Sequence, residues 1–213
     1  YILAIDQGTT SSRVMIFDHD SREVARAQAP ITQYFPASGW VEHDADQIWQ
    51  TVVDCLQNAK REAALDWSDI AAIGITNQRE TIVVWDRFTG KPLGHAICWQ
   101  CRRTQDRCEA LKAQGLTEPI RERTGLEVDA YFSATKLAWI LDEYPDARER
   151  ARRGDLLAGT IDCWLIWKLT AGDVHATDVS NAARTMLYNI HEKRWDPWLL
   201  ELLDIPAAML PEV

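Results

Sequence analysis

The sequence predicts an α/β domain built on a mixed β-sheet. Short apolar segments joined by polar turns open the chain, which is typical of an antiparallel meander. Segments with helical spacing then alternate with apolar strands, which is typical of α/β domains. The chain has 213 residues, 46% of them apolar, so it is long enough to bury a sizeable core.

Five segments in the first part of the chain are expected to be strands. Ile2–Ile5 and Arg13–Asp18 are apolar and lie on either side of a polar turn, and Glu23–Gln28 follows the next turn. Ile70–Ile75 has the composition of a buried strand, and Thr81–Asp86 has that of another strand. The polar residues between these last two segments interrupt an otherwise apolar region.

A long helix is expected between the third and fourth strands. Asp44 is a good helix N-cap, and Gln47, three residues later, forms a looser version of the capping box. Apolar side chains with helical spacing then share one face, at Ile48, Val52, Leu56 and Ala59.

The second half of the chain is predicted to be mainly helical, with a further short strand at Leu156–Ala158. Pro145 and Gly172 are expected to end helices or to follow them. The clearer helical segments are Thr104–Gln114, Lys136–Tyr144 and Asp162–Leu169.

Composition excludes several classes of function. The formal net charge of −9 argues against a nucleic-acid partner, because phosphates require a basic surface. No segment has the apolar length that spans a bilayer, and the N-terminus lacks the pattern of a signal peptide. We therefore expect a cytoplasmic protein whose five cysteines are reduced thiols. Of the ten tryptophans, all but Trp99 are expected to pack in the core.

The segment DQGTTSSR, residues 6–13, is a candidate phosphate-binding turn. The chain has neither G-x-G-x-x-G nor a Walker A motif, so a phosphate site would need another form. Gly8 would permit a positive φ and close approach of an anion, and Asp6 could hold Mg²⁺. Backbone N–H groups, hydroxyls and a guanidinium would contact phosphate oxygens, at Thr9, Thr10, Ser11 and Arg13. The alternative is a plain polar hairpin turn.

Three further segments resemble the FGGY family of carbohydrate kinases and, within it, the glycerol kinases. They are GITNQRET at residues 74–81, WQCRR at residues 99–103, and YFSATKLAW at residues 131–139. The order of strand, Asp6, Gly8 and Thr9 likewise resembles the first phosphate hairpin of the actin, hexokinase and Hsp70 superfamily. The likeness extends over residues 1–213.

The resemblance implies an RNase H-like α/β fold, with a mixed five-stranded sheet flanked by helices. It implies ATP-dependent phosphorylation of glycerol to glycerol 3-phosphate, with Mg²⁺ at Asp6. It places the nucleotide phosphates at Thr9, Thr10, Ser11 and Arg13, and the substrate at Thr9, Arg79, Glu80, Trp99 and Tyr131. A homo-oligomer is also implied.

The chemistry of these residue types suits a small polyol. Arg79 and Glu80 offer a charged donor and a charged acceptor for hydroxyl groups. Trp99 and Tyr131 could cover the carbon atoms and exclude water. A site that pairs hydroxyls also rejects analogues that lack them.

The sequence departs from the family in two respects. The family's catalytic aspartate lies in a Gly-Asp-Gln segment that is absent here, so we expect the base beyond Val213 and no catalytic residue within the chain. We therefore expect residues 1–213 to be an N-terminal substrate-binding domain without its C-terminal nucleotide domain, and to be inactive alone. Ala130 also stands where proline is expected, which removes a backbone constraint on the Tyr131 loop.

Other interpretations remain open at this stage. A kinase for another polyol or a ketose such as xylulose would share most of these motifs. An actin-like or Hsp70-like ATPase domain without kinase activity would share the hairpin but would have no use for Arg79, Glu80, Trp99 and Tyr131. Cys98 and Cys101 offer one pair of zinc ligands but no second pair of the usual kind.

Overall fold

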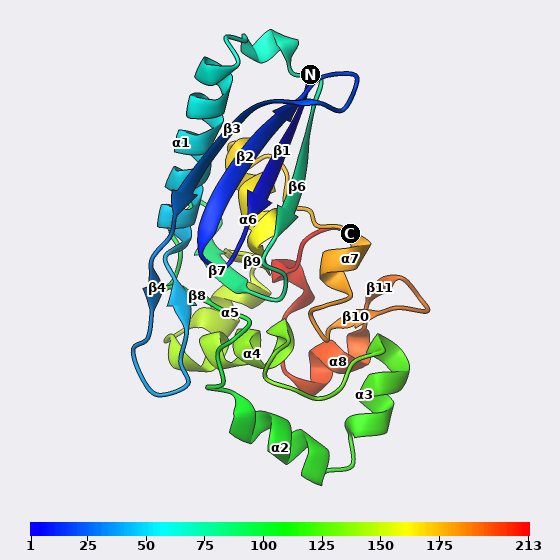
Figure 1. The fold of residues 1–213 in the computed structure, drawn as a ribbon. Helices are drawn as coiled ribbons and strands as arrows, with labels where there is room; N and C mark the ends of the chain where they lie inside the picture. Colours follow the sequence, from blue (N-terminus) through cyan, green and yellow to red (C-terminus); the bar gives the residue numbers. More distant parts are fainter. The chain divides into compact units, whose positions relative to one another are not determined.

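The computed structural model describes all of residues 1–213 and divides them into two compact units. The first unit contains residues 1–33 and 43–78, and the second contains residues 34–42 and 79–213. Helices and strands occur together in the chain (Figure 1), so the predicted α/β class is confirmed. None of the helices has the length and hydropathy that crossing a membrane requires.

The first unit is a mixed sheet with one helix on it (Figure 1). Strands β1 (Ile2–Gln7), β2 (Ser11–Phe17) and β3 (Glu23–Pro30) form the predicted antiparallel meander. Strand β6 (Ala72–Asn77) pairs with β1 in parallel, which gives the order β3-β2-β1-β6. Helix α1 (Ala45–Glu62) packs against β2 and β3 and buries one face of the meander.

Helix α1 begins as its sequence predicts. The Asp44 carboxylate accepts hydrogen bonds from the backbone N–H groups of Asp46 and Gln47 and so caps the helix. The prediction of a capping box is otherwise wrong, because the Gln47 side chain does not return to the backbone of Asp44. It accepts from the backbone N–H of Thr32 and donates to the Thr32 hydroxyl instead. The predicted apolar face is buried, at Ile48, Val52, Leu56 and Ala59.

The expectation of a buried strand at Ile70–Ile75 is wrong. Strand β6 lies at the edge of its sheet and pairs with β1 alone, and α1 packs mainly against β2 and β3. The side chain of Ile73 consequently stays 46% exposed, although it is in register with the buried Leu3. The apolar composition of this segment therefore predicted a strand correctly, but it did not predict how far the strand is buried.

A separate five-stranded sheet has the order β4-β5-β8-β7-β9, and its strands β8, β7 and β9 belong to the second unit. Its main pair is β7 (Ile82–Asp86) and β9 (Leu156–Thr160), which are antiparallel and almost fully buried. The strand predicted at Thr81–Asp86 thus belongs to this sheet and not to the sheet of the meander. The shorter strands are β4 (Gln33–Tyr34), β5 (Glu42–His43) and β8 (Ala96–Ile97), and β10 (Tyr188–Asn189) pairs with β11 (Arg194–Trp195) as a small hairpin.

The three predicted helices of the second unit are present as α2 (Gln105–Ala113), α4 (Ser133–Glu143) and α6 (Ile161–Leu169). Helix α4 ends just before Pro145, as expected. Four short helices were not predicted, because one or two turns carry little periodic signal: α3 (Thr117–Thr124), α5 (Ala147–Arg152), α7 (Val179–Ala182) and α8 (Pro197–Leu202). Two 3₁₀ turns, η1 (Trp67–Asp69) and η2 (Ala207–Met209), complete the chain.

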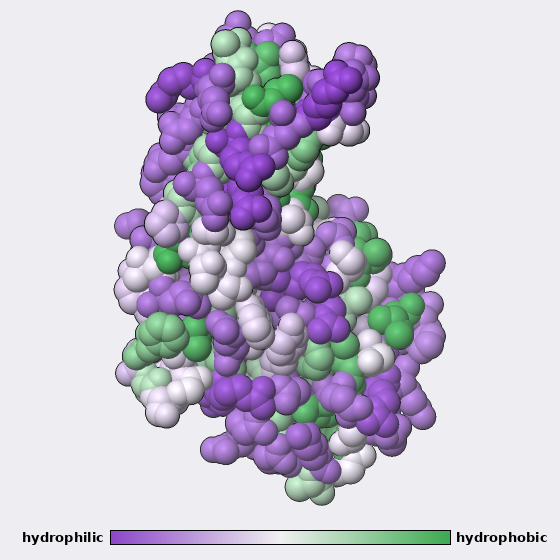
Figure 2. Space-filling view, viewed as in Figure 1, coloured by the Kyte–Doolittle hydropathy of each residue, from purple (hydrophilic) through white to green (hydrophobic).

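Large aromatic side chains fill much of the core of the second unit. Trp85 and Trp164 are fully buried, and their rings meet edge to face with centroids 5.2 Å apart. Trp67 is an exception to the expected burial of tryptophan, being 50% exposed. All five cysteines are buried as free thiols. Hydrophilic residues predominate on the face seen in Figure 2, with small separate hydrophobic areas.

Candidate functional site

The predicted site residues fall into two groups, one in each unit. The first group lies on the hairpin that joins β1 to β2. The chain reverses at Thr9 and Thr10, and the backbone N–H of Gly8 donates to the carbonyl oxygen of Ser11 at 2.9 Å. The amides of Gln7 and Gln78 both donate to the Gly8 carbonyl, at 2.8 and 3.2 Å. The turn is therefore held in place at its base by side chains of its own unit.

Gly8 does not have the positive φ that the sequence suggested, so that part of the prediction is wrong. The two following threonines make the reversal, which leaves Gly8 in an ordinary conformation. A Cβ atom at Gly8 would lie 3.4 Å from the carbonyl oxygen of Ser11, a close but tolerable contact. The absence of a side chain leaves the backbone of the turn open to close approach, which remains the reason to expect glycine there.

Asp6 and Arg13 are directly opposite each other on β1 and β2. The guanidinium lies 3.9 Å from the carboxylate, at the limit of an ion pair, and the side chains are 37% (Arg13) and 41% (Asp6) exposed. Arg13 also donates to the Gln28 amide oxygen at 3.3 Å, and Gln28 donates to the Ser11 hydroxyl at 2.9 Å. One exposed carboxylate and one exposed cation thus stand beside a turn rich in hydroxyl groups.

These residues fit a magnesium–nucleotide complex better than a metal held by protein alone. No three His, Cys, Asp or Glu side chains gather anywhere in the structure in a way that could hold a metal ion. Magnesium, however, commonly uses only one or two carboxylates together with phosphate oxygens and waters. A lone exposed Asp6 opposite Arg13 suits that mode of binding.

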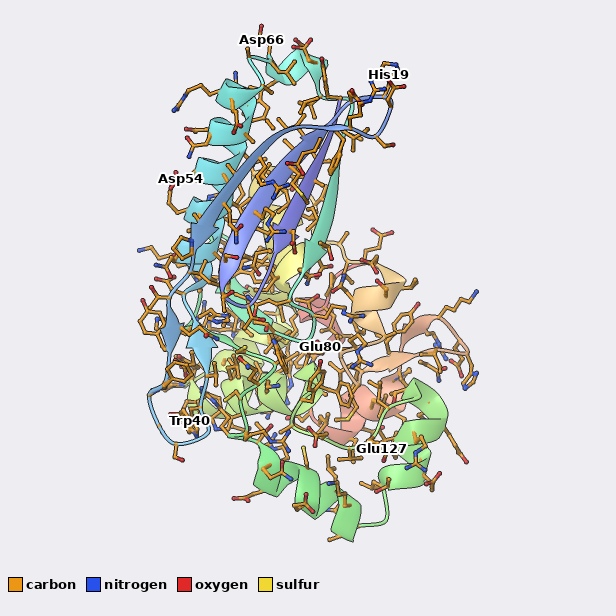
Figure 3. The ribbon with its side chains drawn as sticks, in the orientation of Figure 1. His19, Trp40, Asp54, Asp66, Glu80 and Glu127 are labelled. Carbon is orange, nitrogen blue, oxygen red and sulfur yellow. The ribbon has the colours of Figure 1, made fainter.

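The second group is centred on Glu80, which follows β6 in the chain and lies beside the start of α4 (Figure 3). The Glu80 side chain is only 3% exposed and accepts a hydrogen bond from Nε of Arg184 at 2.6 Å. Its backbone has a φ of 66°, which is unusual for a residue with a side chain. Strained positions of this kind concentrate at functional sites.

The side chains of Trp99 and Tyr131 lie in contact with each other. Their ring centroids are 5.2 Å apart with planes inclined by 56°. Arg184 connects this pair to Glu80, because its guanidinium carbon also lies 5.7 Å from the centre of the Tyr131 ring. The structure therefore brings together Glu80, Trp99 and Tyr131, three of the predicted substrate residues.

Arg79, the neighbour of Glu80, is available as the hydrogen-bond donor that the sequence suggests. Arg79 is exposed and makes no ion pair with its neighbour Glu80, whose partner is Arg184. An exposed guanidinium has its donors available for a ligand. Sequence reasoning missed Arg184, because it lies 104 positions from Glu80 and belongs to no motif.

Two other carboxylates have structural partners. Asp162 is buried and accepts hydrogen bonds from the hydroxyls of Thr160 and Thr177, both at 2.5 Å. Burial raises the pKa of the Asp162 carboxyl above its ordinary value. Asp178 caps α7 by accepting from the backbone N–H groups of Ser180 and Asn181. Neither carboxylate belongs to the groups described above.

Comparison with known proteins agrees with the resemblance that the motifs suggested. The chain is 60% identical to glycerol kinase of Brachyspira hyodysenteriae and 59% identical to glycerol kinase 2 of Pseudomonas aeruginosa, in each case over all 213 residues. It spans 43% and 42% of the lengths of these two proteins.

Solved structures show the same fold. Glycerol kinase of Plasmodium falciparum, crystallised with ADP, matches 99% of the chain with a TM-score of 0.91 and 36% identity, and the match covers 42% of that protein. Xylulose kinase of Lactobacillus acidophilus matches the whole chain with a TM-score of 0.88, over 41% of its own length, but at 24% identity this shows the fold alone. The sequence model of the FGGY family of carbohydrate kinases, N-terminal domain, matches residues 1–213. The chain therefore belongs to the FGGY family of carbohydrate kinases, as an N-terminal domain.

Proposed function

We propose that the chain is the substrate-binding domain of a kinase that transfers a phosphoryl group from ATP to glycerol, giving glycerol 3-phosphate. The observation that carries this proposal is the buried Glu80 carboxylate beside the paired rings of Trp99 and Tyr131. A buried carboxylate gives strong, directional acceptance of hydroxyl groups, and the rings cover carbon. The 58–60% identity to glycerol kinases supports glycerol over other polyols and over ketoses such as xylulose.

The residues have distinct roles in this proposal. Glu80 accepts hydrogen bonds from glycerol hydroxyls, Arg79 donates to them, and Trp99 and Tyr131 exclude water. On the hairpin, Thr9, Thr10, Ser11 and Arg13 contact the nucleotide phosphates, and Thr9 also touches the substrate. Mg²⁺ bound with ATP at Asp6 would supply neutralisation of the phosphate charge.

We also propose that a second domain completes the enzyme. It would supply the adenine site and the aspartate that takes the proton of the attacking hydroxyl. The match to less than half the length of the glycerol kinases supports this division. Residues 1–213 alone should then have negligible kinase activity, since phosphoryl transfer depends on positioning groups from both domains. A cytoplasmic homo-oligomer is part of the same proposal and rests on the family likeness.

A coupled assay of ADP release by the whole kinase tests the proposal, with glycerol, with xylulose and without an acceptor. We expect ADP release to depend on glycerol. A rate of ADP release that is the same with and without an acceptor would indicate an ATPase of the actin or Hsp70 kind. Arg79→Ala should raise KM for glycerol about tenfold to a hundredfold and leave KM for ATP unchanged, because it removes a charged hydrogen-bond donor. Arg61→Ala, an exposed arginine near the end of α1, is the matched control. Equal effects of Arg79→Ala on both substrates would contradict the assigned role.

A further inference from the structure

The first turn of helix α4 holds three separate segments of the candidate substrate site. Ser133, the first residue of α4, is fully buried, and its hydroxyl donates to the backbone carbonyl of Glu80 at 2.8 Å. Lys136, one turn later, is also fully buried. Helical side chains point back toward the N-terminus, so the Lys136 ammonium reaches the loop that precedes α4.

The three N–H donors of the Lys136 ammonium are shared among four acceptors, all of them backbone carbonyl groups. Three of them belong to consecutive residues before the helix: Ala130 at 2.5 Å, Tyr131 at 2.9 Å and Phe132 at 3.4 Å. The fourth is the carbonyl of Trp99, at 3.3 Å and 37 positions away in the chain. One cation therefore connects the backbones of the two aromatic residues that line the candidate site.

A merely structural role accounts poorly for this lysine. No carboxylate forms an ion pair with it, and burying an ammonium without such a partner costs free energy that an apolar side chain would not. The loop has a second support, since the Asp129 carboxylate accepts from the backbone N–H of Tyr131 at 2.7 Å and pairs with Arg102. What the lysine adds is the link between Tyr131 and Trp99.

We propose that Lys136 is a positioning residue for the glycerol site, which fixes Trp99 and Tyr131 relative to each other through their backbone carbonyls. This inference rests on the proposed function, because it concerns the same substrate pocket.

The charge on Lys136 is open to titration. Burial lowers the pKa of its ammonium from the ordinary 10.5 to about 8, and the neighbouring Cys101, Cys98, Glu80 and Cys108 oppose that shift. A neutral amine has two N–H donors where the ammonium has three, and it lacks the charge that strengthens each bond. The link between the two aromatic residues should therefore weaken above about pH 8.

The free energy of unfolding should increase over the same pH range in which the link between Trp99 and Tyr131 weakens. Between pH 8 and 10.5 the unfolded chain keeps a proton on this lysine that the folded chain has lost. The contribution of Lys136 to the free energy of unfolding therefore rises with pH over that window. A loss of glycerol affinity over the same window would come from the site itself and not from a general loosening of the fold.

The experiment measures KM for glycerol and for ATP in the whole kinase between pH 7 and 9.5. Glycerol does not titrate in this range, so its KM should be flat to about pH 8 and then rise up to about tenfold, with KM for ATP nearly constant. Lys136→Met should raise KM for glycerol about tenfold at pH 7 and abolish the rise at high pH. Lys112→Met, on the surface of α2 and paired with Glu109, is the control and should match the wild type.

The possible outcomes separate the two proposals. Wild-type enzyme that does not phosphorylate glycerol at pH 7 would overturn the proposed function. Wild-type enzyme that does so with a flat glycerol KM up to pH 9.5, or with equal changes in both KM values, would overturn the role of Lys136. The wild-type profile decides the matter if Lys136→Met does not fold.

Discussion

Replacing Arg184 by methionine should destabilise the chain more than removing any surface arginine. The substitution keeps an unbranched aliphatic side chain and removes the guanidinium, which pairs with Glu80 and also lies over the rings of Tyr131 and Phe132. The Glu80 carboxylate, only 3% exposed, then loses its ion-pair partner at 2.6 Å. A buried charge without a partner is far less favourable than an exposed one.

The size of the expected loss in free energy of unfolding depends on how deeply Glu80 and Arg184 are buried. Breaking a fully buried pair by removing one partner costs about 3–5 kcal/mol. The Arg184 side chain is 31% exposed, so some water already reaches this pair, and we discount the loss to about 2–3 kcal/mol. For a chain of this size that corresponds to a fall in Tm of roughly 5–10 °C.

The assay is thermal unfolding of the 213-residue chain followed by circular dichroism. The matched control is Arg152→Met, which removes a surface pair with Asp204 whose side chains are 51% and 59% exposed and should cost no more than about 1 kcal/mol. Adding Glu80→Gln to Arg184→Met should recover much of the loss, because the unpaired charge disappears. Equal falls in Tm for the two arginine variants, or no recovery in the double variant, would refute the reasoning.

Two further predictions concern the second unit. Burial lowers the pKa of the His175 imidazole to about 4, although its Nε2 donates to the carbonyl of Ala158. Between pH 6.5 and 4 only the unfolded chain binds a proton at this residue. The free energy of unfolding should therefore decrease as the pH is lowered, by up to about 1.4 kcal/mol per pH unit. Urea unfolding at pH 7, 6 and 5 should show this slope, and His175→Gln should reduce it. Gly159→Ala places a Cβ atom 2.5 Å from Sγ of Cys163 and should cost about 1–3 kcal/mol in the same assay, whereas Gly74→Ala, with no atom within 4 Å, should change little.

The local parts of the structure were the predictable ones. The meander and the start of α1 follow from alternation and from the Asp44 cap, which act between residues close in the chain. The burial of β6 was not predictable in the same way, because it depends on which strands α1 covers. The conformation of Gly8 was also misjudged, since the neighbouring threonines make the turn.

The candidate site was predictable only where motifs carry it. Glu80, Trp99 and Tyr131 were identified through family segments, and the structure brings them together. Arg184 and Lys136 hold those residues over separations of 104 and 37 positions, and no pattern in the sequence links such distant partners. Tertiary packing alone reveals them.

The left-handed backbone at Glu80 has a consequence for how this position would respond to selection. Glycine adopts a φ of 66° without strain, and it would also remove a buried carboxylate while leaving the partly exposed Arg184 in contact with water. A library sorted for folding alone should therefore enrich glycine at position 80, whereas, under the proposed function, one sorted for growth on glycerol should retain glutamate. Folding screens for heat resistance would then first remove the substrate contact that we propose for this residue, as expected where function and stability compete.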